Sequence, residues 1–438
     1  MLTLGIDYGT TKNAAVLYDP DCPQDFHAVS APHHAAIETP EFRAEQEFGK
    51  VWQSLLQLIS RLPAEKLAQV RAVGLTGQMH SVVCWNDSEI SPVITWQDKR
   101  ASAAGILDKF IRQTRRKLAD GFGAVSLAAM ALDGSLARYT HAASPVSLIG
   151  AMLCGDRNNV FMEATFGASW GIWDMDNDSW DMDAVRSLQI PPAILAPVTP
   201  VGSCIGRTCG IPGLPDGIPV CAPVGDNQAS VLATAGNTGD ELYLTLGTGA
   251  QLSAVTDHGE LSLPENSPVE LRPFTNGRML AVYAPLCGGK AWVALGNMVN
   301  SCFTALGLPP LPERELLDKL DKIALTNTAN GVTFNPLFLG RRNEPDATGE
   351  ISGLTLENFR LEFLASALVK GMIGELFEFF PSSLIASRKK VLGSGNCVRF
   401  CAAVRQEIGR RANAELIVKQ LSEEAACGAA QLAGKMMK

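Results

Sequence analysis

The chain has 438 residues, of which 46% are hydrophobic and 19% charged, with a formal net charge of −8 and 11 cysteines. This length exceeds the size at which a single hydrophobic core stops growing, so we expect two domains. The composition excludes a disordered chain, and an acidic balance without basic blocks argues against nucleic acid as a partner.

The first apolar run begins at residue 2, which leaves no room for a leader, and no apolar stretch reaches the roughly 18 residues of a membrane span. We therefore expect a cytoplasmic protein with no membrane partner. The cysteines are scattered, which predicts reduced thiols and neither a disulfide framework nor a zinc site.

The stretch LGIDYGTTK, residues 4–12, predicts a strand over 2–7, a Gly/Thr turn, and a second strand over 13–19. One interpretation is a phosphate site, in which Gly9 allows close approach, Thr10 and Thr11 add hydroxyl donors, and Asp7 holds Mg²⁺ through water. The other is an ordinary β-hairpin with an Asp-initiated turn.

An α/β pattern follows this hairpin. Residues 41–62 predict a helix with Phe48, Val51, Trp52, Leu55 and Ile59 on one face, residues 70–77 and 81–85 predict strands, and residues 101–118 predict a further helix. Polar and aromatic side chains gather in two turns, namely Gln78 and His80 in the first and Trp96, Asp98 and Arg100 in the second. Such groups suit the hydroxyl and C–H faces of a sugar, although a lone histidine is often structural.

Residues 191–223 are rich in Pro, Gly and Cys and predict a long ordered loop. Asp226 follows this loop and precedes a predicted helix, where it could accept the proton of a substrate hydroxyl or serve as a helix N-cap. The stretch LYLTLGTGAQLSAVTD, residues 242–257, repeats the strand, Gly/Thr turn and strand of the N-terminus. This repeat predicts two related domains, over 1–237 and 238–438, with the boundary near 236–239.

The second half continues the α/β pattern, with strands over 278–285 and 389–396 and helices over 289–306, 361–380, 397–411 and 423–436. The turn LGSGN, residues 392–396, lies between a strand and a helix, where Gly393 and Gly395 could admit a nucleotide or simply start the helix. The spacing matches neither a Rossmann fingerprint nor a P-loop.

Taken together and in this order, GIDYGTT, GQMH, WQDKR, GDNQAS, LTLGTG and GSGN resemble the FGGY carbohydrate kinases, and the longer stretches TGQMHSVVCW and GIPVCAPVGDNQAS resemble sedoheptulokinase and xylulokinase-like members. The resemblance implies an α/β fold of the actin-like ATPase and sugar kinase superfamily, with two ribonuclease-H-like domains around a central cleft. The N-terminal domain would bind the sugar and carry the catalytic base, and the C-terminal domain would bind the nucleotide.

The resemblance also assigns roles by position. Asp226 matches the catalytic base and Asp7 the metal-associated carboxylate. The ATP-binding positions would be Gly9, Thr10, Thr11, Lys12, Gly247, Thr248, Gly249, Gly393, Ser394, Gly395 and Asn396, and the sugar-binding positions Gln78, Met79, His80, Trp96, Asp98 and Asn227. The implied reaction is Mg²⁺-dependent transfer of the ATP γ-phosphoryl group to a ketose hydroxyl, with sedoheptulose as the first substrate to test and a homodimer as the assembly to test.

Lys12 and Ser394 depart from the usual family pattern, since the first replaces a small or hydroxyl residue and the second interrupts a glycine run. These departures keep open a sugar sensor of the same fold with impaired catalysis. A sugar-independent actin-like ATPase is a further alternative.

Overall fold

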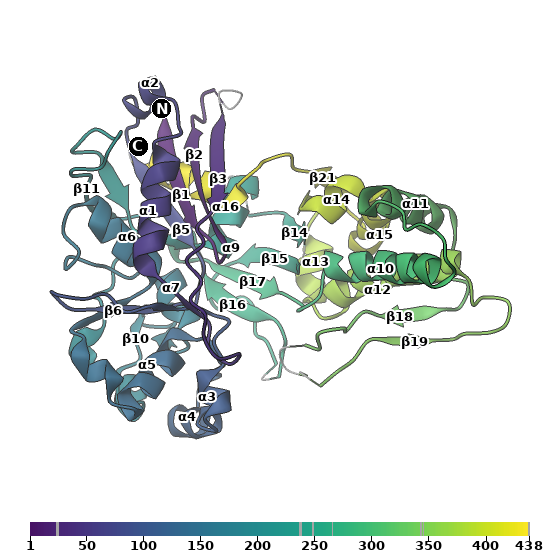
Figure 1. Cartoon of the computed structure of the whole chain (residues 1–438), viewed down its shortest axis with the longest axis horizontal. Coiled ribbons are helices and arrows are strands. Elements are labelled where there is room, and N and C mark those ends of the chain that lie inside the picture. The colour runs from purple at the N-terminus through teal and green to yellow at the C-terminus, as the bar shows by residue number, and fades with distance from the viewer. Residues whose placement is uncertain are drawn as a thin grey trace. The chain divides into compact units, whose positions relative to one another are not determined.

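Two units make up the computed structural model, which describes residues 1–22, 26–235, 239–247, 249–264, 266–341, 344 and 346–436 (Figure 1). Unit 1 comprises the described parts of Met1–Thr234, Arg272–Gly277 and Leu421–Lys438, and unit 2 those of Ala235–Leu271 and Arg278–Gln420. The predicted division at 237/238 differs from this one chiefly in the C-terminal segment, which groups with the first unit.

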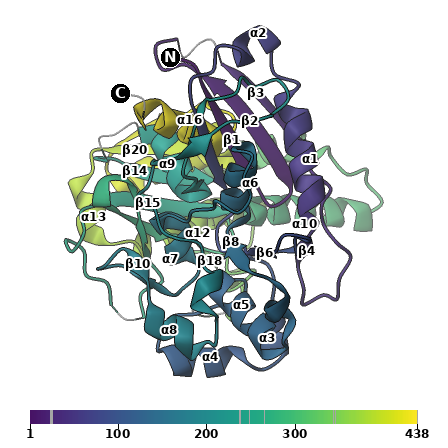
Figure 2. The ribbon, with the colours of Figure 1, turned by 90° about the vertical axis from the view of Figure 1, so that its left-hand side faces the viewer.

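The central sheet of unit 1 has the strand order β11-β12-β5-β1-β2-β3, and β13 also pairs with β5. β1 runs antiparallel to β2 and parallel to β5, so the N-terminal hairpin lies in the middle of the sheet. Figure 2 shows β1, β2 and β3 side by side, with α1 and α16 on opposite sides of them. The strands are β1 Thr3–Tyr8, β2 Lys12–Tyr18, β3 His27–Pro32, β5 Val73–Gly77, β11 Cys204–Arg207, β12 Pro219–Cys221 and β13 Val224–Gly225.

The central sheet of unit 2 repeats this arrangement in the order β16-β17-β15-β14-β20-β21. In each unit an antiparallel hairpin continues into a third antiparallel strand on one side and pairs with two successive parallel strands on the other. This shared order confirms the predicted repeat and the ribonuclease-H-like fold. The strands are β14 Leu242–Leu246, β15 Ala250–Thr256, β16 Glu270–Pro273, β17 Met279–Tyr283, β20 Lys390–Ser394 and β21 Glu415–Val418.

Short two-stranded pairs and helices complete both units. The pairs are β4 Glu45–Gln46 with β7 Val93–Ile94, β6 Val83–Trp85 with β8 His141–Ala143, β9 Trp173–Asp174 with β10 Ser179–Trp180, and β18 Thr333–Asn335 with β19 Glu350–Ser352. The helices are α1 Phe48–Ile59, α2 Ala64–Leu67, α3 Arg100–Ala103, α4 Leu107–Thr114, α5 Gly123–Leu132, α6 Pro145–Leu153, α7 Ala164–Ser169, α8 Met182–Ser187, α9 Asp226–Ala235, α10 Gly289–Ala305, α11 Glu313–Thr326, α12 Leu361–Glu378, α13 Ser382–Ser387, α14 Asn396–Phe400, α15 Ala402–Ala412 and α16 Glu424–Met436. Among the described residues, these helices all lack either the length or the apolar character that crossing a bilayer requires.

Helix α1 confirms the predicted apolar face but is shorter than the predicted 41–62. Phe48, Val51, Leu55 and Ile59 are buried, while Trp52 is half-buried. The helix begins only at Phe48 because residues 45–46 pair with β7 as strand β4. A short strand, which carries Glu45 and Gln46, therefore occupies the start of the predicted helix.

Helix α16 packs against β1 and β5 at very short range because both strands present glycine to it. A Cβ added to Gly5 would lie 1.9 Å from the carbonyl oxygen of Ala426, and one added to Gly74 would lie 1.9 Å from that of Ala429. Side chains at either strand position would push the helix off the sheet. The last helix of the chain is thus part of the core of unit 1.

Three further predictions are corrected, two by local backbone conformation and one by strand pairing. The predicted helix 101–118 is split into α3 and α4 at Gly105, whose φ of 67° ends the first helix. The predicted helix 397–411 is split into α14 and α15 at Cys401, which is extended. The predicted loop 191–223 contains β11 and β12, which pair antiparallel at the edge of the sheet.

Candidate active site

Two carboxylates lie at the same edge of the unit 1 sheet, where three parallel strands end. Asp7 on β1 is in register with Thr76 on β5, and Thr76 is in register with Val224 on β13, which leads directly into Asp226. Since neighbouring strands are about 4.8 Å apart, β1 and β13 are separated by about 10 Å at this edge. The sequence therefore brings Asp7 and Asp226 together across β5, with the Thr76 hydroxyl between them.

Burial dominates the electrostatics of both carboxylates. Desolvation, together with the nearby charges of Asp226 and Glu423, raises the pKa of Asp7 to about 7, and its Oδ1 atom is buried without a hydrogen-bond partner among the described residues. Desolvation likewise raises the pKa of Asp226 to about 6, although the Asn227 N–H, 2.8 Å from Asp226 Oδ1, and the Arg272 charge both act to lower it. Asp7 is thus suited to a cation and Asp226 to proton transfer.

The turn that follows β5 carries three predicted sugar-binding positions. His80 adopts a left-handed conformation with φ of 68°, its Nδ1 donates to the Ser169 carbonyl oxygen at 2.6 Å, and its ring stacks on Phe122 at 4.7 Å. Because a carbonyl only accepts, the proton of a neutral His80 is on Nδ1. Gln78 and Met79 are buried, with exposed fractions of 1% and 6%.

Asn227 also lies beside the catalytic candidate, as the second residue of α9. Its Oδ1 accepts a hydrogen bond from Arg272 Nη1 at 3.2 Å. Arg272 has no counterpart in the sequence prediction, because it stands about 45 residues further along the chain without any recognisable motif.

The turn between β1 and β2 is closed by a hydrogen bond from the Gly9 N–H to the Lys12 carbonyl at 3.0 Å. Thr11 and Lys12 are exposed, and Thr10 is partly exposed. The Lys12 ammonium lies 2.7 and 2.8 Å from the two carboxylate oxygens of Glu423, just before α16. The departure at position 12 therefore provides a surface ion pair within unit 1, and its side chain is directed to Glu423.

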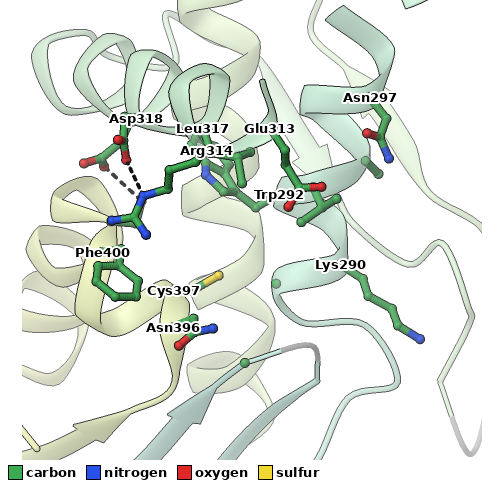
Figure 3. Close-up of a pocket in the computed structure, with 16 residues that line it drawn as sticks. Lys290, Trp292, Asn297, Glu313, Arg314, Leu317, Asp318, Asn396, Cys397 and Phe400 are labelled. Atoms are coloured by element: carbon green, nitrogen blue, oxygen red, sulfur yellow. Dashed lines mark hydrogen bonds and ion pairs between the residues drawn. The ribbon is translucent and has the colours of Figure 1, made fainter. Parts of the chain in front are cut away.

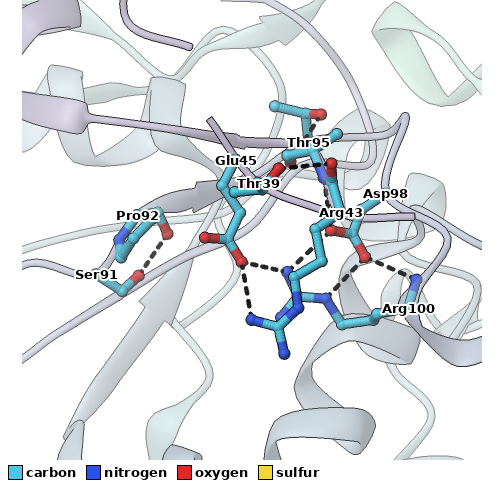
Figure 4. Close-up of polar contacts among 9 residues, drawn as sticks. Thr39, Arg43, Glu45, Ser91, Pro92, Thr95, Asp98 and Arg100 are labelled. Atoms are coloured by element: carbon cyan, nitrogen blue, oxygen red, sulfur yellow. Dashed lines mark hydrogen bonds and ion pairs between the residues drawn. The ribbon is translucent and has the colours of Figure 1, made fainter. Parts of the chain in front are cut away.

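Asp98 is held in a different network from the other sugar-binding candidates (Figure 4). Its exposed fraction is 1%, and its oxygens accept from the Ala44 N–H at 3.0 Å and from Arg100 Nε at 2.7 Å. Arg100 also contacts Glu45 Oε1 at 2.7 Å. Sugar binding by Asp98 would require one of these bonds to break, so we leave Asp98 out of the proposed sugar site.

In unit 2, the adenosine-motif residues lie between β20 and α14. Ser394 faces Thr245 on the neighbouring strand, with 3.1 Å between the two hydroxyl oxygens, so this departure is accommodated inside the sheet. Gly395 has φ of 88°, and a Cβ there would lie 2.5 Å from the Leu246 carbonyl oxygen. Only glycine fits this position, directly against the strand that leads to Gly247. Thr248 lies outside the described residues, and Gly249 follows it before β15.

A cavity of ≈ 580 Å³ opens beside this turn (Figure 3). The Arg314 guanidinium lies over the Phe400 ring at 4.2 Å, and 51% of the Phe400 residue surface is exposed. Asp321 fixes one wall, since it accepts from the N–H groups of Ala402 and Ala403 at 2.8 Å. The lining residues are Gly247, Gly289, Lys290, Trp292, Val293, Ala294, Asn297, Glu313, Arg314, Leu317, Asp318, Asp321, Asn396, Cys397, Phe400 and Cys401.

Sequence reasoning predicted the Gly247 and Asn396 part of this cavity but missed the walls contributed by α10 and α11. Helix α10 itself was predicted over 289–306, and the glycine pair at Gly288 and Gly289 before it is the signal that could have indicated its place beside a ligand. α11 shows only ordinary amphipathic spacing, which carries no information about a ligand.

Residues 2–233 match the model of the FGGY family of carbohydrate kinases, N-terminal domain, which is more than half of the chain. The chain belongs to the FGGY family of carbohydrate kinases.

Relatives of this FGGY kinase extend along nearly its whole length. Sedoheptulokinase from Mus musculus is 27% identical and that from Homo sapiens 28% identical, each over 93% of this chain and 92% of the relative. Among solved structures, xylulose kinase from Lactobacillus acidophilus has a TM-score of 0.82 at 19% identity, covering 100% of this chain and 89% of that one. Plasmodium falciparum glycerol kinase with ADP has a TM-score of 0.79 at 19% identity, covering 100% and 90%.

These similarities show an ATP-dependent sugar kinase with the fold that the sequence motifs implied. The kinase brings together Asp7, Asp226 and Asn227 at one sheet edge of unit 1 and gathers Gly247, Gly395 and Asn396 at the turns of unit 2.

Proposed function

We propose that this FGGY kinase transfers the γ-phosphoryl group of ATP to a hydroxyl of a ketose, with sedoheptulose as its substrate. The observation that carries the choice of sugar is the similarity to two sedoheptulokinases along nearly the full length of both chains. A family relationship alone would leave the sugar open, because FGGY relatives of this chain include kinases named for glycerol, gluconate and apulose.

Asp226 is the proposed general base. A carboxylate with a pKa of about 6 is ionised at neutral pH and still accepts a proton more readily than an ordinary aspartate. The Asn227 N–H fixes one of its oxygens from the backbone. Asp226 would orient the attacking hydroxyl and take its proton as the phosphoryl group is transferred.

Asp7 is the proposed Mg²⁺ residue, and its surroundings fit that role. A buried carboxylate oxygen without a hydrogen-bond partner among the described residues is a hard oxygen ligand, available directly or through water. When bound, Mg²⁺ would neutralise charge on the ATP phosphates. Gly9, Thr10 and Thr11 would hold those phosphates through N–H and hydroxyl donors, and Lys12 contributes through its ion pair with Glu423 instead.

The cavity of unit 2 is the proposed nucleoside site. Phe400 and Arg314 offer a flat, cationic face for a purine base, and Trp292 contributes to the apolar lining. Gly247, Gly249, Gly393, Ser394, Gly395 and Asn396 would surround the ribose and phosphates, where glycine lets a ligand approach the backbone closely.

The proposed sugar-binding residues are Gln78, Met79, His80 and Asn227, with Trp96 at the exposed end of the group. His80 is held in a strained left-handed conformation by Ser169 and Phe122, a cost that is common at functional sites. Neither departure from the family pattern blocks the site, because Lys12 is paired with Glu423 and Ser394 with Thr245. Both observations favour an active kinase over a catalytically impaired sensor.

The test is coupled ADP release by the purified protein with ATP, Mg²⁺ and a panel of sedoheptulose, xylulose, ribulose and fructose, beside a control without sugar. We expect turnover with sedoheptulose and little ATP hydrolysis without sugar. Asp108→Asn on the exposed face of α4 is the matched control for Asp226→Asn and should retain full activity. ATP binding without turnover on any sugar would favour the sensor, and rapid hydrolysis without sugar would favour an actin-like ATPase. A homodimer remains a prediction that sedimentation velocity would test.

A further inference from the structure

We call the turn between β1 and β2, residues 9–11, the phosphate turn. Three side chains of unit 1 form hydrogen bonds to it. The Thr10 carbonyl oxygen accepts from Gln46 Nε2 at 2.6 Å and lies 3.2 Å from His33 Nε2. His33 Nδ1 accepts from the Ala35 N–H at 3.1 Å, so the proton of the neutral ring is on Nε2 and points at the turn. The Thr10 hydroxyl oxygen accepts from Trp96 Nε1 at 2.9 Å.

Anchoring the Thr10 carbonyl sets the direction of the next N–H. The Thr10 carbonyl and the Thr11 N–H belong to one planar trans peptide, in which the two groups point in opposite directions. With the carbonyl fixed toward Gln46 and His33, the Thr11 N–H is turned away from them, toward the exposed side of the turn. An N–H held in this direction is a prepared donor for an anion, because no reorientation is needed on binding.

The oxygen of the Gln46 amide is connected to the turn after β5, which carries the proposed sugar-binding residues. Gln46 Oε1 accepts from the Tyr8 hydroxyl and from Gln78 Nε2, the latter at 3.3 Å. Gln78 Oε1 in turn accepts from Ser81 Oγ at 3.1 Å. These bonds define which way the Gln46 amide faces, since its oxygen meets two donors and its nitrogen meets a carbonyl.

Gln46 is itself held firmly. Its exposed fraction is 5%, and it lies on β4, which pairs with β7. The neighbouring Glu45 contacts Arg100, which Asp98 fixes from the opposite side (Figure 4). The buried Asp98 network therefore supports the short strand that presents Gln46 to the turn.

We propose that Gln46 is a positioning residue that holds the phosphate turn in its donor orientation and joins it to Gln78. The inference rests on the proposed role of Thr10 and Thr11 in phosphate binding. Gln46 touches neither the sugar nor the nucleotide in this scheme and acts through its bonds to Thr10 and Gln78. Its loss should weaken binding of the ATP phosphates while leaving binding of the nucleoside alone unchanged.

The experiment compares the affinities of the full-length protein for a non-hydrolysable ATP analogue with Mg²⁺ and for adenosine, by titration calorimetry. Gln46→Met removes both ends of the amide without adding charge, and Tyr8→Phe is the matched control that removes one bond to Oε1 and keeps the bond to Thr10. We expect Gln46→Met to raise the Kd for the analogue roughly ten-fold, the scale of one misplaced hydrogen bond to a charged group. The Kd for adenosine should stay within about two-fold of wild type in both variants, because adenosine has no phosphate for the turn to hold. The Kd for the analogue in Tyr8→Phe should also stay within about two-fold, because the bond from Gln46 Nε2 to the Thr10 carbonyl is kept.

A merely structural role for Gln46 would lower the melting temperature or the active fraction without altering the ratio of the two affinities. An unchanged ratio in Gln46→Met, or an equal change in Tyr8→Phe, would overturn the inference. If Gln46→Met does not fold, His33→Phe removes the second bond to the Thr10 carbonyl oxygen, and the same change in ratio is expected.

The proposed function can be refuted by results that leave the role of Gln46 to be decided by the affinity ratio. A wild-type protein that binds the analogue more tightly than adenosine but phosphorylates none of the ketoses would refute the choice of sugar, and the affinity ratio would still decide the role of Gln46. A wild-type protein that binds both ligands equally would refute the phosphate turn and the inference together.

Discussion

Replacing Asp226 by asparagine tests the proposed chemistry most directly, because the amide keeps the shape of the carboxylate but cannot accept the proton. General-base catalysis is worth about 10² to 10⁴ in rate, so kcat for the best ketose should fall by at least about 10². The Kd for the ATP analogue should stay close to wild type, since Asp226 is neither among the residues proposed to hold the phosphates nor in the lining of the nucleoside cavity.

The pH dependence of the wild-type enzyme follows from the raised pKa. Desolvation moves the pKa of Asp226 from 3.8 to about 6. At pH 5 a carboxyl with a pKa of about 6 is ionised in about 9% of molecules, against about 94% for a pKa of 3.8. Because the base works only when ionised, kcat/KM should fall on the acidic side with a midpoint near pH 6. Arg272→Met should move this midpoint upward, since the Arg272 charge lowers the Asp226 pKa.

The assay is coupled ADP release between pH 5 and pH 8.5 at saturating Mg²⁺, which favours the ionised form of Asp7. A midpoint near pH 4, or an acidic limb that persists unchanged in the residual activity of Asp226→Asn, would refute the assignment of the base. An Asp226→Asn enzyme with wild-type kcat would refute it outright.

Asp226→Asn should also increase the free energy of unfolding at pH 8. A carboxyl whose folded pKa is raised contributes stability below pH 3.8 that is lost as pH rises through about 6, so the ionised Asp226 is unfavourable at pH 8. A pKa shift of roughly two units corresponds to about 2 to 3 kcal/mol in the free energy of unfolding. Asp226→Asn should therefore increase stability by this amount at pH 8 and leave it unchanged at pH 3. Denaturant unfolding at both pH values measures this difference, and a less stable variant at pH 8 would contradict the burial argument.

Three further substitutions separate structural from binding roles. Lys12→Met should change the free energy of unfolding by less than about 1 kcal/mol, because the Lys12 side chain of this ion pair is 48% exposed, and should leave the KM for ATP within about three-fold. A ten-fold rise in that KM would show that Lys12 binds phosphate instead. Asp98→Asn should destabilise unit 1 by about 1 to 3 kcal/mol in denaturant melts, because Arg100 loses one of its two carboxylate partners and keeps Glu45, and a change confined to the KM for sugar would contradict this. Phe400→Ala should raise the KM for ATP by roughly ten-fold through lost stacking, and an equal rise in the KM for sugar would place the nucleoside elsewhere.

The repeat of strand, Gly/Thr turn and strand predicted two related domains, because hairpins with alternating apolar residues are local features, whereas the fold itself was implied by the resemblance to the FGGY kinases. The errors arose where tertiary contacts override local pattern. Residues 45–46 extend a helical pattern in sequence but pair with β7 in the structure, and β11 and β12 are too short and too rich in Pro and Gly to stand out before the sheet edge forms.

The same distinction between local sequence motifs and tertiary contacts applies to the candidate site. Asp7, Asp226 and the glycine turns stand at strand ends in recognisable motifs, so sequence reasoning found them. Gln46, Arg272 and Arg314 reach their sites only through the tertiary fold, and each stands in an unremarkable stretch of sequence. Asp98 is the opposite case. It stands in the family motif WQDKR, yet its bond to Arg100 gives it a structural role.

The packing of α16 on β1 has a consequence for how the protein is made. Glu423 and Lys12 form an ion pair although their positions in the chain are 411 residues apart. The strand surface at Gly5 and Gly74 stays uncovered until α16 leaves the ribosome. Unit 2 can finish folding first during synthesis, whereas unit 1 must wait as an incomplete sheet with an exposed apolar face. A premature stop codon shortly before α16 would therefore leave unit 2 complete and leave unit 1 without the helix that packs on Gly5 and Gly74.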